Sequence, residues 1–205
     1  MKDKTKIIAA FLITISIFIS GLLIGNLAID SKVGLLNDLQ NDLYTESLGF
    51  DTLYDLANEN ICDENSIIEL NFMLTEFGNK ITYLENEGID LINLKNQYYS
   101  FQIKHFLIIN KINNDCGKKY DTLLYFYGSE EDCNLCSIQG NEITKMKNEK
   151  KELMVYSFDY NSNYLPVKNL ILKYNVVDVP SLVINGKKHN KFINYLDLKT
   201  LVDSN

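Results

Sequence analysis

Hydrophobic residues form an unbroken run near the start of the chain. No charged side chain occurs between Ile7 and Ile29. As an α-helix this run would rise about 34 Å, compared with about 30 Å for the hydrocarbon core of a membrane. Three lysines and one aspartate precede the run, whereas the charges directly after it cancel. The positive-inside rule therefore predicts an N-terminal transmembrane helix with a cytoplasmic N-terminus, and it places the rest of the chain outside the cytoplasm.

A cleaved signal peptide is the alternative interpretation of this run. The apolar region of a signal peptide usually spans about 7–15 residues. The nearest pair of small residues, Asn26 and Ala28, also makes a poor cleavage site. We therefore expect residues 1–30 to form a cytoplasmic tip and an uncleaved anchor of a single-pass cell-membrane protein. Under either interpretation the remainder of the chain is exported.

Apolar residues recur at every third or fourth position through the next part of the chain, residues 31–117. This spacing is typical of amphipathic helices. One helix is predicted from about Glu64 to before Gly88 and another from Asp90, so Glu87–Ile89 becomes a tight turn between antiparallel helices. We expect this hairpin to pack on the following domain or on a membrane partner, because an apolar stripe is more often a core face than a ligand site. The stripe of the last helix consists of Leu91, Leu94, Tyr98, Phe101, His105, Ile108 and Ile112.

Two of the four cysteines flank this hairpin. Cys62 precedes its first helix and Cys116 follows its second, so folding at Gly88 brings them within reach of each other. A disulfide there would persist in an exported protein and would stabilise the fold by about 4 kcal/mol on the chain-entropy model. Two unpaired thiols are an alternative. A zinc site with all four cysteines is a third option, which the lack of a second CxxC motif and of suitably spaced histidines disfavours.

The other two cysteines form a CxxC motif, Cys133-Asn-Leu-Cys136. An apolar run over residues 122–127 predicts a buried strand before the motif, and helical character follows it up to Asn148. The motif therefore lies where a strand leads into a helix N-terminus. The helix dipole there stabilises a thiolate, so Cys133 is expected to be the nucleophile in disulfide exchange. Cys136 is close enough to resolve the mixed disulfide.

The remaining segments predict an α/β domain over residues 118–205. A second strand is expected at residues 153–158 and a second helix at 167–174. A strand then enters through Val179-Pro180 and ends at an Asn-Gly turn, which is a strong hairpin signal. A last strand near Lys191 to Ile193 and a helix over residues 196–202 complete the order β-α-β-α-β-β-α.

From Tyr120 to Asp203 the sequence resembles the thioredoxin-like superfamily. The resemblance rests on the CxxC motif after a strand and on the segment Val179-Pro-Ser-Leu-Val-Ile-Asn-Gly186 that follows it. It implies that the Val179–Pro180 bond is cis, lies beside the dithiol and positions the backbone of a substrate segment around its cysteine. An ordinary edge-strand proline is the alternative for Pro180.

Several departures limit what this resemblance carries over. The aromatic residue and the Gly-Pro pair of classical thioredoxin are absent around the motif, as is the histidine of strongly oxidising relatives, so the redox direction stays open. Tyr127 or Gly128 falls where thioredoxin keeps a buried acid. Glu130, Glu131 and Asp132 precede the motif, and they would raise the pKa of the Cys133 thiol if they lay near its sulfur. Alternatively, they only complement the helix dipole and face water.

Composition and charge exclude other functions. The net charge is -7 and every basic residue is a lysine, which disfavours binding to nucleic acid. No phosphate-binding loop or Ser-His-Asp order is visible, and no metal or organic cofactor is expected. His105 and His189 have no identifiable cysteine or carboxylate partner, so both are expected to be structural or solvated.

Together these features predict a membrane-anchored, extracytoplasmic thiol-disulfide oxidoreductase. Cys133 would attack, Cys136 would resolve, and Val179-Pro180 would position the substrate. The expected partners are cysteine-containing exported proteins and an integral-membrane redox protein that recycles the dithiol. The competing hypothesis is a non-catalytic thioredoxin-like module of a membrane complex, in which Cys133 and Cys136 form only a structural bridge.

Overall fold

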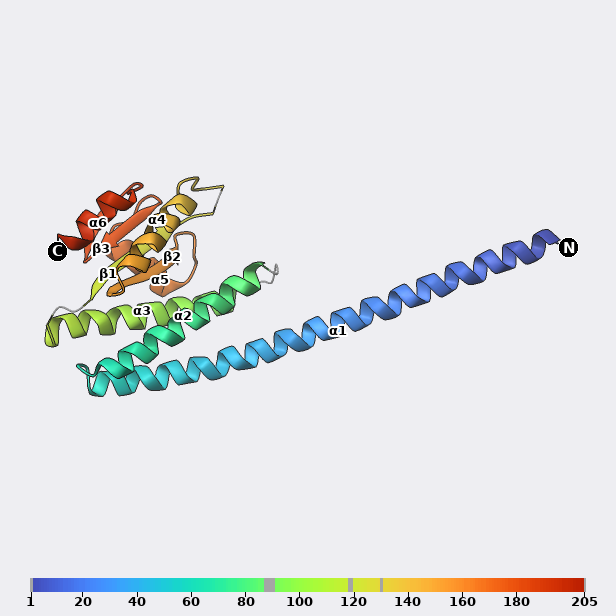
Figure 1. Ribbon diagram of the computed structural model, residues 1–205, viewed down its shortest axis with the longest axis horizontal. Helices are drawn as coiled ribbons and strands as arrows, with labels where there is room; N and C mark the ends of the chain where they lie inside the picture. Colours follow the sequence, from blue (N-terminus) through green and yellow to red (C-terminus); the bar gives the residue numbers. More distant parts are fainter. Residues whose placement is uncertain (1, 87–90, 118–119, 130, 205) are drawn as a thin grey trace. The chain divides into compact units, whose positions relative to one another are not determined.

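The structure is a computed structural model of the 205-residue chain (Figure 1). It describes residues 2–86, 91–117, 120–129 and 131–204, with side chains for 11–25, 44–85, 91–117, 120–129 and 131–204. The chain divides into two compact units, Met1–Leu48 and Gly49–Asn205. All features discussed below, apart from the start of the first helix, belong to the second unit.

The predicted transmembrane helix is wrong. The run from Ile7 to Ile29 is part of the much longer helix α1 (Lys2–Glu59). Among the side chains that the structure describes, no helix is long and apolar enough to cross a membrane.

Helices α2 (Glu64–Asn86) and α3 (Ile92–Asp115) pack against each other, and each buries most of its predicted apolar stripe. In α3, Leu94 and Tyr98 of that stripe are only half-buried. Aromatic rings join the contact, because Phe77 lies edge-on to Phe101 with 5.1 Å between ring centroids, and Phe50 of α1 stacks on Phe101 at 4.4 Å. The predicted turn Glu87–Ile89 and the predicted helix start at Asp90 lie outside the described residues. The buried apolar residues of α2 are Ile67, Leu70, Leu74, Phe77, Ile81 and Leu84.

A four-stranded sheet follows the helices, with the strand order β2-β1-β3-β4. Its strands are β1 (Asp121–Tyr127), β2 (Leu153–Asp159), β3 (Ser181–Ile184) and β4 (Lys187–Asn190). Strand β1 is parallel to β2 and antiparallel to β3, and β3 is antiparallel to β4. The mostly buried strands β1 and β3 occupy the centre, as their continuous apolar runs suggest.

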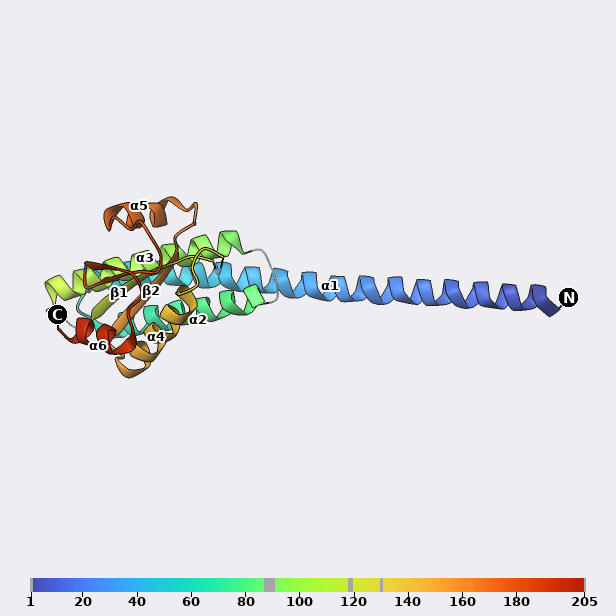
Figure 2. The ribbon, with the colours of Figure 1, turned by 90° about the horizontal axis from the view of Figure 1, so that it is seen from above.

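Helices cover both faces of the sheet. Helices α4 (Cys136–Glu149) and α6 (Tyr195–Asp203) contact each other on one face, and α5 (Leu165–Lys173) lies on the other, as Figure 2 shows. Helix α3 contacts both β2 and α5. The core between the sheet and α4 and α6 is formed by Leu123, Tyr125, Ile143, Met146, Leu153, Leu182, Ile184, Leu198 and Val202.

Helix α3 also covers the outer edge of strand β2. The side-chain amide of Gln102 donates to the Ser157 carbonyl oxygen at 3.2 Å, and its oxygen accepts from the Ser157 N–H at 2.6 Å. These two bonds reproduce the pairing that a neighbouring strand would make. Tyr99 and Phe106 pack their rings on the same strand, against Phe158 and Tyr156. A helix therefore stands where a further strand would extend the sheet.

The last strand lies earlier in the chain than the sequence analysis predicted. Strand β4 covers Lys187–Asn190, whereas a strand was expected near Lys191 to Ile193. The reason is the tight turn at Asn185 and Gly186, whose φ values of 47° and 82° reverse the chain so quickly that Lys187 pairs directly with Ile184. Pairing then ends at Lys191, which has a φ of 88°.

Candidate active site around the Cys133–Cys136 disulfide

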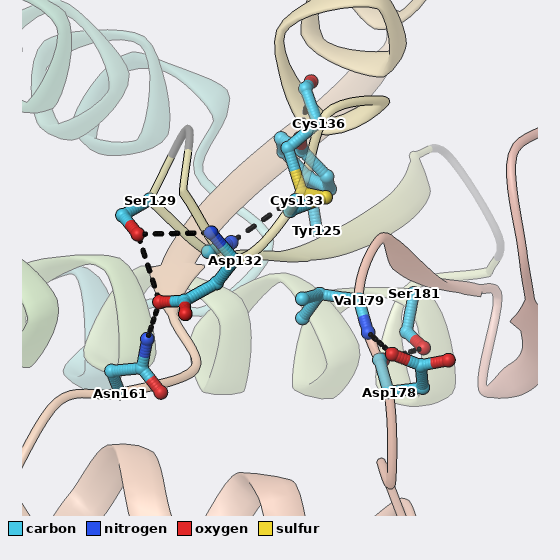
Figure 3. The surroundings of a disulfide bond; sticks show 10 residues. Tyr125, Ser129, Asp132, Cys133, Cys136, Asn161, Asp178, Val179 and Ser181 are labelled. Atoms are coloured by element: carbon cyan, nitrogen blue, oxygen red, sulfur yellow. Dashed lines mark hydrogen bonds between the residues drawn. A yellow bond between two sulfur atoms is a disulfide. The ribbon is translucent and has the colours of Figure 1, made fainter.

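Cys133 and Cys136 form a disulfide in the segment that connects β1 to α4 (Figure 3). Cys136 is the first residue of α4, and Cys133 lies three positions earlier. The Gly128 N–H donates to the Cys136 sulfur at 3.4 Å, and the Tyr125 hydroxyl donates to the Cys136 carbonyl oxygen at 2.6 Å. Strand β1 thus supplies the groups that hold the second cysteine at the start of the helix.

Hydrogen bonds also fix the loop before Cys133. The Cys133 N–H donates to the Ser129 carbonyl oxygen at 2.8 Å. The Asp132 carboxylate accepts from the Ser129 hydroxyl at 2.8 Å and from the side-chain amide of Asn161 at 2.9 Å. In Figure 3 this carboxylate points toward Asn161 and away from the disulfide. Of the three acids that precede the motif, Asp132 and Glu131 are exposed, and Glu130 lies outside the described residues.

The Val179–Pro180 segment lies beside the disulfide, and its peptide bond is cis. A Cβ atom built on Gly128 would be 3.2 Å from Val179 Cγ2 and 3.5 Å from the Cys133 Cβ atom, so the Gly128 backbone is in close contact with both residues. The Val179 N–H donates to the Asp178 carboxylate at 2.8 Å. The Pro180 carbonyl oxygen accepts from the Lys191 N–H at 3.2 Å. The predicted substrate-binding residues and the cysteine pair are thus neighbours in space.

The disulfide faces a cavity but exposes little surface. Cys133 is 6% exposed and Cys136 is 5% exposed. Both residues line a cavity of about 690 Å³, whose other walls come from α2, α3, β1, β2 and α4. Both cysteines are therefore largely buried in the wall of this cavity.

Two tyrosines of strand β1 line the same cavity as the disulfide. Tyr127 lines the cavity, and burial raises the pKa of its phenol far above the ordinary value. Burial also raises the pKa of Tyr125 to about 12. Both side chains are neutral at pH 7 and cannot accept a proton as a carboxylate would. Among the described residues that line the cavity, Glu85 carries the one carboxylate.

The sequence analysis did not assign Glu85 or the tyrosines of α3 to the site. Tyr98 and Tyr99 lie more than thirty positions before the CxxC motif, and they reach the cavity only because α3 packs on strand β2. The adjacent pair of tyrosines beside an apolar stripe is the one local sign of a second contact face. The spacing of residues along the helix does not show which part of the protein these tyrosines contact.

Cys62 and Cys116 form the second disulfide, with 5.8 Å between their Cα atoms. It joins the residues just before α2 and just after α3. Neither residue lines the cavity beside Cys133. All four cysteines are in disulfides, so none is available as a thiolate ligand for zinc in this state.

Fold and site together define a mixed α/β protein with a CxxC disulfide at the start of a helix. No family model matches the chain, and no curated protein matches it. Solved structures similar to part of it include a malarial protein at 21% identity, with a TM-score of 0.36 over 42% of this chain and 96% of that one. Thioredoxin-2, a component of the malaria parasite protein secretion machinery, is 20% identical, with a TM-score of 0.37 over 43% of this chain and 85% of its own. Oxidised thioredoxin O2 from Arabidopsis thaliana is 21% identical, with a TM-score of 0.34 over 47% and 87% of the two chains.

Proposed function

We propose that the protein exchanges thiols and disulfides with cysteine-containing proteins through Cys133 and Cys136. The observation that carries this proposal is the position of the disulfide, which lies at the N-terminus of α4 and lines a cavity large enough for a substrate segment. Unpaired amide groups at a helix N-terminus favour a thiolate over a thiol, and the thiolate is the reactive species.

The exchange proceeds in two balanced steps. The Cys133 thiolate attacks one sulfur of a substrate disulfide, forms a mixed disulfide and releases the other substrate sulfur as a thiolate. The Cys136 thiolate then attacks the Cys133 sulfur, which restores the Cys133–Cys136 disulfide and releases the second substrate thiol. Two electrons pass from the protein to the substrate. In the opposite direction the same steps oxidise a substrate dithiol.

The Val179–Pro180 segment is proposed to position the substrate backbone. Its location beside Cys133 supports this role. The Val179 N–H is already bonded to the Asp178 carboxylate, so a substrate strand that pairs with this N–H has to replace that bond. The Asp178 carboxylate therefore keeps the Val179 N–H hydrogen-bonded until a substrate backbone replaces it.

The two disulfides support the proposal that the protein functions in an oxidising compartment outside the cytoplasm, because disulfides persist in such compartments and are rare in reducing ones. We propose exported cysteine-containing proteins as the substrates. A dithiol that has reacted must be recycled, so a further redox protein has to supply or remove its two electrons.

A redox titration of the Cys133–Cys136 pair in the full-length protein tests the proposal. Thiol trapping in glutathione and dithiothreitol buffers gives the midpoint potential, and Cys62→Ser/Cys116→Ser removes the signal of the other disulfide. A reversible midpoint above about -270 mV is expected, and its value would indicate whether oxidation or reduction of substrates is favoured. A pair that resists reduction below about -300 mV would contradict the proposal.

A non-catalytic module with a structural disulfide is the competing function. The low exposure of Cys133 and Cys136 favours it, because buried cysteines are poorly accessible to a second protein. Alkylation of the reduced, folded protein distinguishes the two functions. Rapid modification of Cys133 supports exchange, whereas resistance of both thiols supports the structural role.

A further inference from the structure

The cavity beside the disulfide has two walls from different parts of the chain. Cys133, Cys136 and Gly140 line it from the start of α4, and strand β1 contributes two tyrosines. Helices α2 and α3 supply the opposite wall. The helical hairpin thus takes part in the site and is more than a support for the sheet. Its contribution consists of Thr75, Gly78, Asn79, Ile81, Thr82, Glu85, Lys95, Tyr98 and Tyr99.

The largest side chains in the wall of this cavity are uncharged and aromatic. Tyr98, Tyr99, Tyr125 and Tyr127 all line it. Burial raises the pKa of Tyr98 to about 12 and also raises the pKa of Tyr99, so their phenols are neutral at pH 7. The hydroxyls of Tyr99 and Tyr127 are 3.5 Å apart. The aromatic rings provide edges and faces against which another ring can pack.

The charged groups in the cavity are already paired. Glu85 and Lys95 form an ion pair. The Lys147 ammonium donates to the carbonyl oxygens of Lys151 at 3.2 Å and of Leu153 at 2.6 Å. A cation that entered the cavity would lose water and find Glu85 already paired with Lys95, and an anion would have to displace the carbonyl oxygens bonded to Lys147, so either entry is costly. The site therefore favours an uncharged occupant.

We propose that this cavity binds an aromatic side chain next to the reacting cysteine of a substrate protein, so that helices α2 and α3 select substrates. The inference rests on the proposed exchange function and names its substrate class. An aromatic residue close to the cysteine can enter the cavity while the substrate sulfur reaches Cys133, because Cys133 itself lines the cavity. A volume of about 690 Å³ accommodates such a ring together with part of the peptide backbone.

Single-turnover reduction of peptide disulfides tests the proposal. Full-length protein, reduced at Cys133 and Cys136, is mixed with a disulfide-linked dimer of a cysteine peptide that carries either Phe or Asp beside the cysteine. Each protein dithiol then reduces one peptide disulfide to two thiols. The second-order rate constant is expected to be at least about tenfold higher for the Phe peptide, because burial of a phenyl ring provides at least that factor.

Two variants fill the cavity from opposite walls. Gly140→Phe is tolerated by the fold because a Cβ atom at Gly140 meets nothing within 4 Å, and Thr82→Phe replaces an exposed residue of α2. Both are expected to remove the preference for the Phe peptide. Asn141→Phe is the matched control, since Asn141 is exposed on the same helix and does not line the cavity. It should keep the preference.

Reduction of bis(2-hydroxyethyl) disulfide separates this inference from the proposed function. This small disulfide needs no side-chain pocket, so the control Asn141→Phe should reduce it within about twofold of the wild-type rate, and the two cavity variants should slow its reduction far less than they slow reduction of the Phe peptide. A wild-type protein that reduces it but treats the Phe and Asp peptides equally would overturn the aromatic site and leave the exchange function intact. Persistence of the preference in Gly140→Phe and Thr82→Phe would also overturn it. A wild-type protein inactive on all three disulfides would refute the exchange function itself.

Discussion

Acidification should weaken the contact between helix α3 and the sheet through one buried histidine. His105 has no exposed surface, and its Nδ1 atom is 2.9 Å from the Tyr156 hydroxyl of strand β2. Its Nε2 atom has no hydrogen-bond partner among the described residues. Burial, assisted by the positive charge of Lys147, lowers the pKa of His105 from 6.5 to about 4. The folded protein therefore keeps this imidazole neutral at pH values where the unfolded chain protonates it.

The sign and size of the effect follow from linkage. The pKa of His105 is lower in the folded state than in the unfolded state, so the unfolded state binds more protons between pH 6.5 and pH 4. The contribution of His105 to the free energy of unfolding is therefore fully present above pH 6.5 and declines as the pH falls toward 4. The difference of about 2.5 units, at about 1.4 kcal/mol per unit, corresponds to about 3.5 kcal/mol. Most of this loss should be present at pH 4.5.

Urea unfolding followed by circular dichroism at pH 7.5 and at pH 4.5 measures the loss. Carboxylates also titrate in this range, so the test is the difference between the wild type and His105→Gln, which carries no titrating ring. The free energy of unfolding should fall by about 2–3 kcal/mol more in the wild type than in the variant. His189→Gln is the matched control for loss of an imidazole. Equal pH dependence in the wild type and His105→Gln would refute the reasoning.

Three further changes probe the disulfide, the sheet edge and the reactive cysteine. Cys62→Ser/Cys116→Ser should lower the free energy of unfolding by about 4 kcal/mol, because the disulfide closes a loop of 54 residues. A loss below about 1 kcal/mol in urea unfolding would contradict this account. Gln102→Leu should lower the free energy of unfolding by about 2 kcal/mol, because it leaves the N–H and carbonyl oxygen of Ser157 unpaired at the edge of β2. Unchanged stability in urea unfolding would show that water replaces the amide. Asp132→Asn removes a negative charge one position before Cys133 in the chain and should lower the pKa of the Cys133 thiol in the reduced protein, as followed by thiolate absorbance. A constant thiol pKa would show that the Asp132 carboxylate, which points toward Asn161, does not act on the sulfur.

Local sequence signals predicted the elements that carry the cysteine pair. The apolar run before the motif becomes β1, and the Asn185-Gly186 turn joins β3 to β4 because both residues adopt positive φ. The pairing of Cys62 with Cys116 was accessible because an antiparallel hairpin brings its two ends together. Each of these inferences depends on neighbours in sequence or on one simple symmetry.

Contacts between distant segments could not be read from the sequence. Gln102 looked like one polar residue on a helix, and its pairing with Ser157 depends on how α3 lies along β2. The tyrosine wall of the cavity depends on the same contact. The apolar run near the N-terminus was misleading for a related reason, since hydropathy reports the composition of a segment and not the helix in which it lies.

The Gln102 amide of α3 pairs with the edge of strand β2, so a fragment without α3 would leave that edge unpaired. A fragment that began at Lys118, where the predicted α/β domain begins, would lack α3. It would expose an unpaired strand edge together with the rings of Tyr156 and Phe158, and such an edge is a template for aggregation. The smallest soluble piece that carries the cysteine pair is therefore expected to begin before the hairpin, near Gly49, where the second compact unit starts.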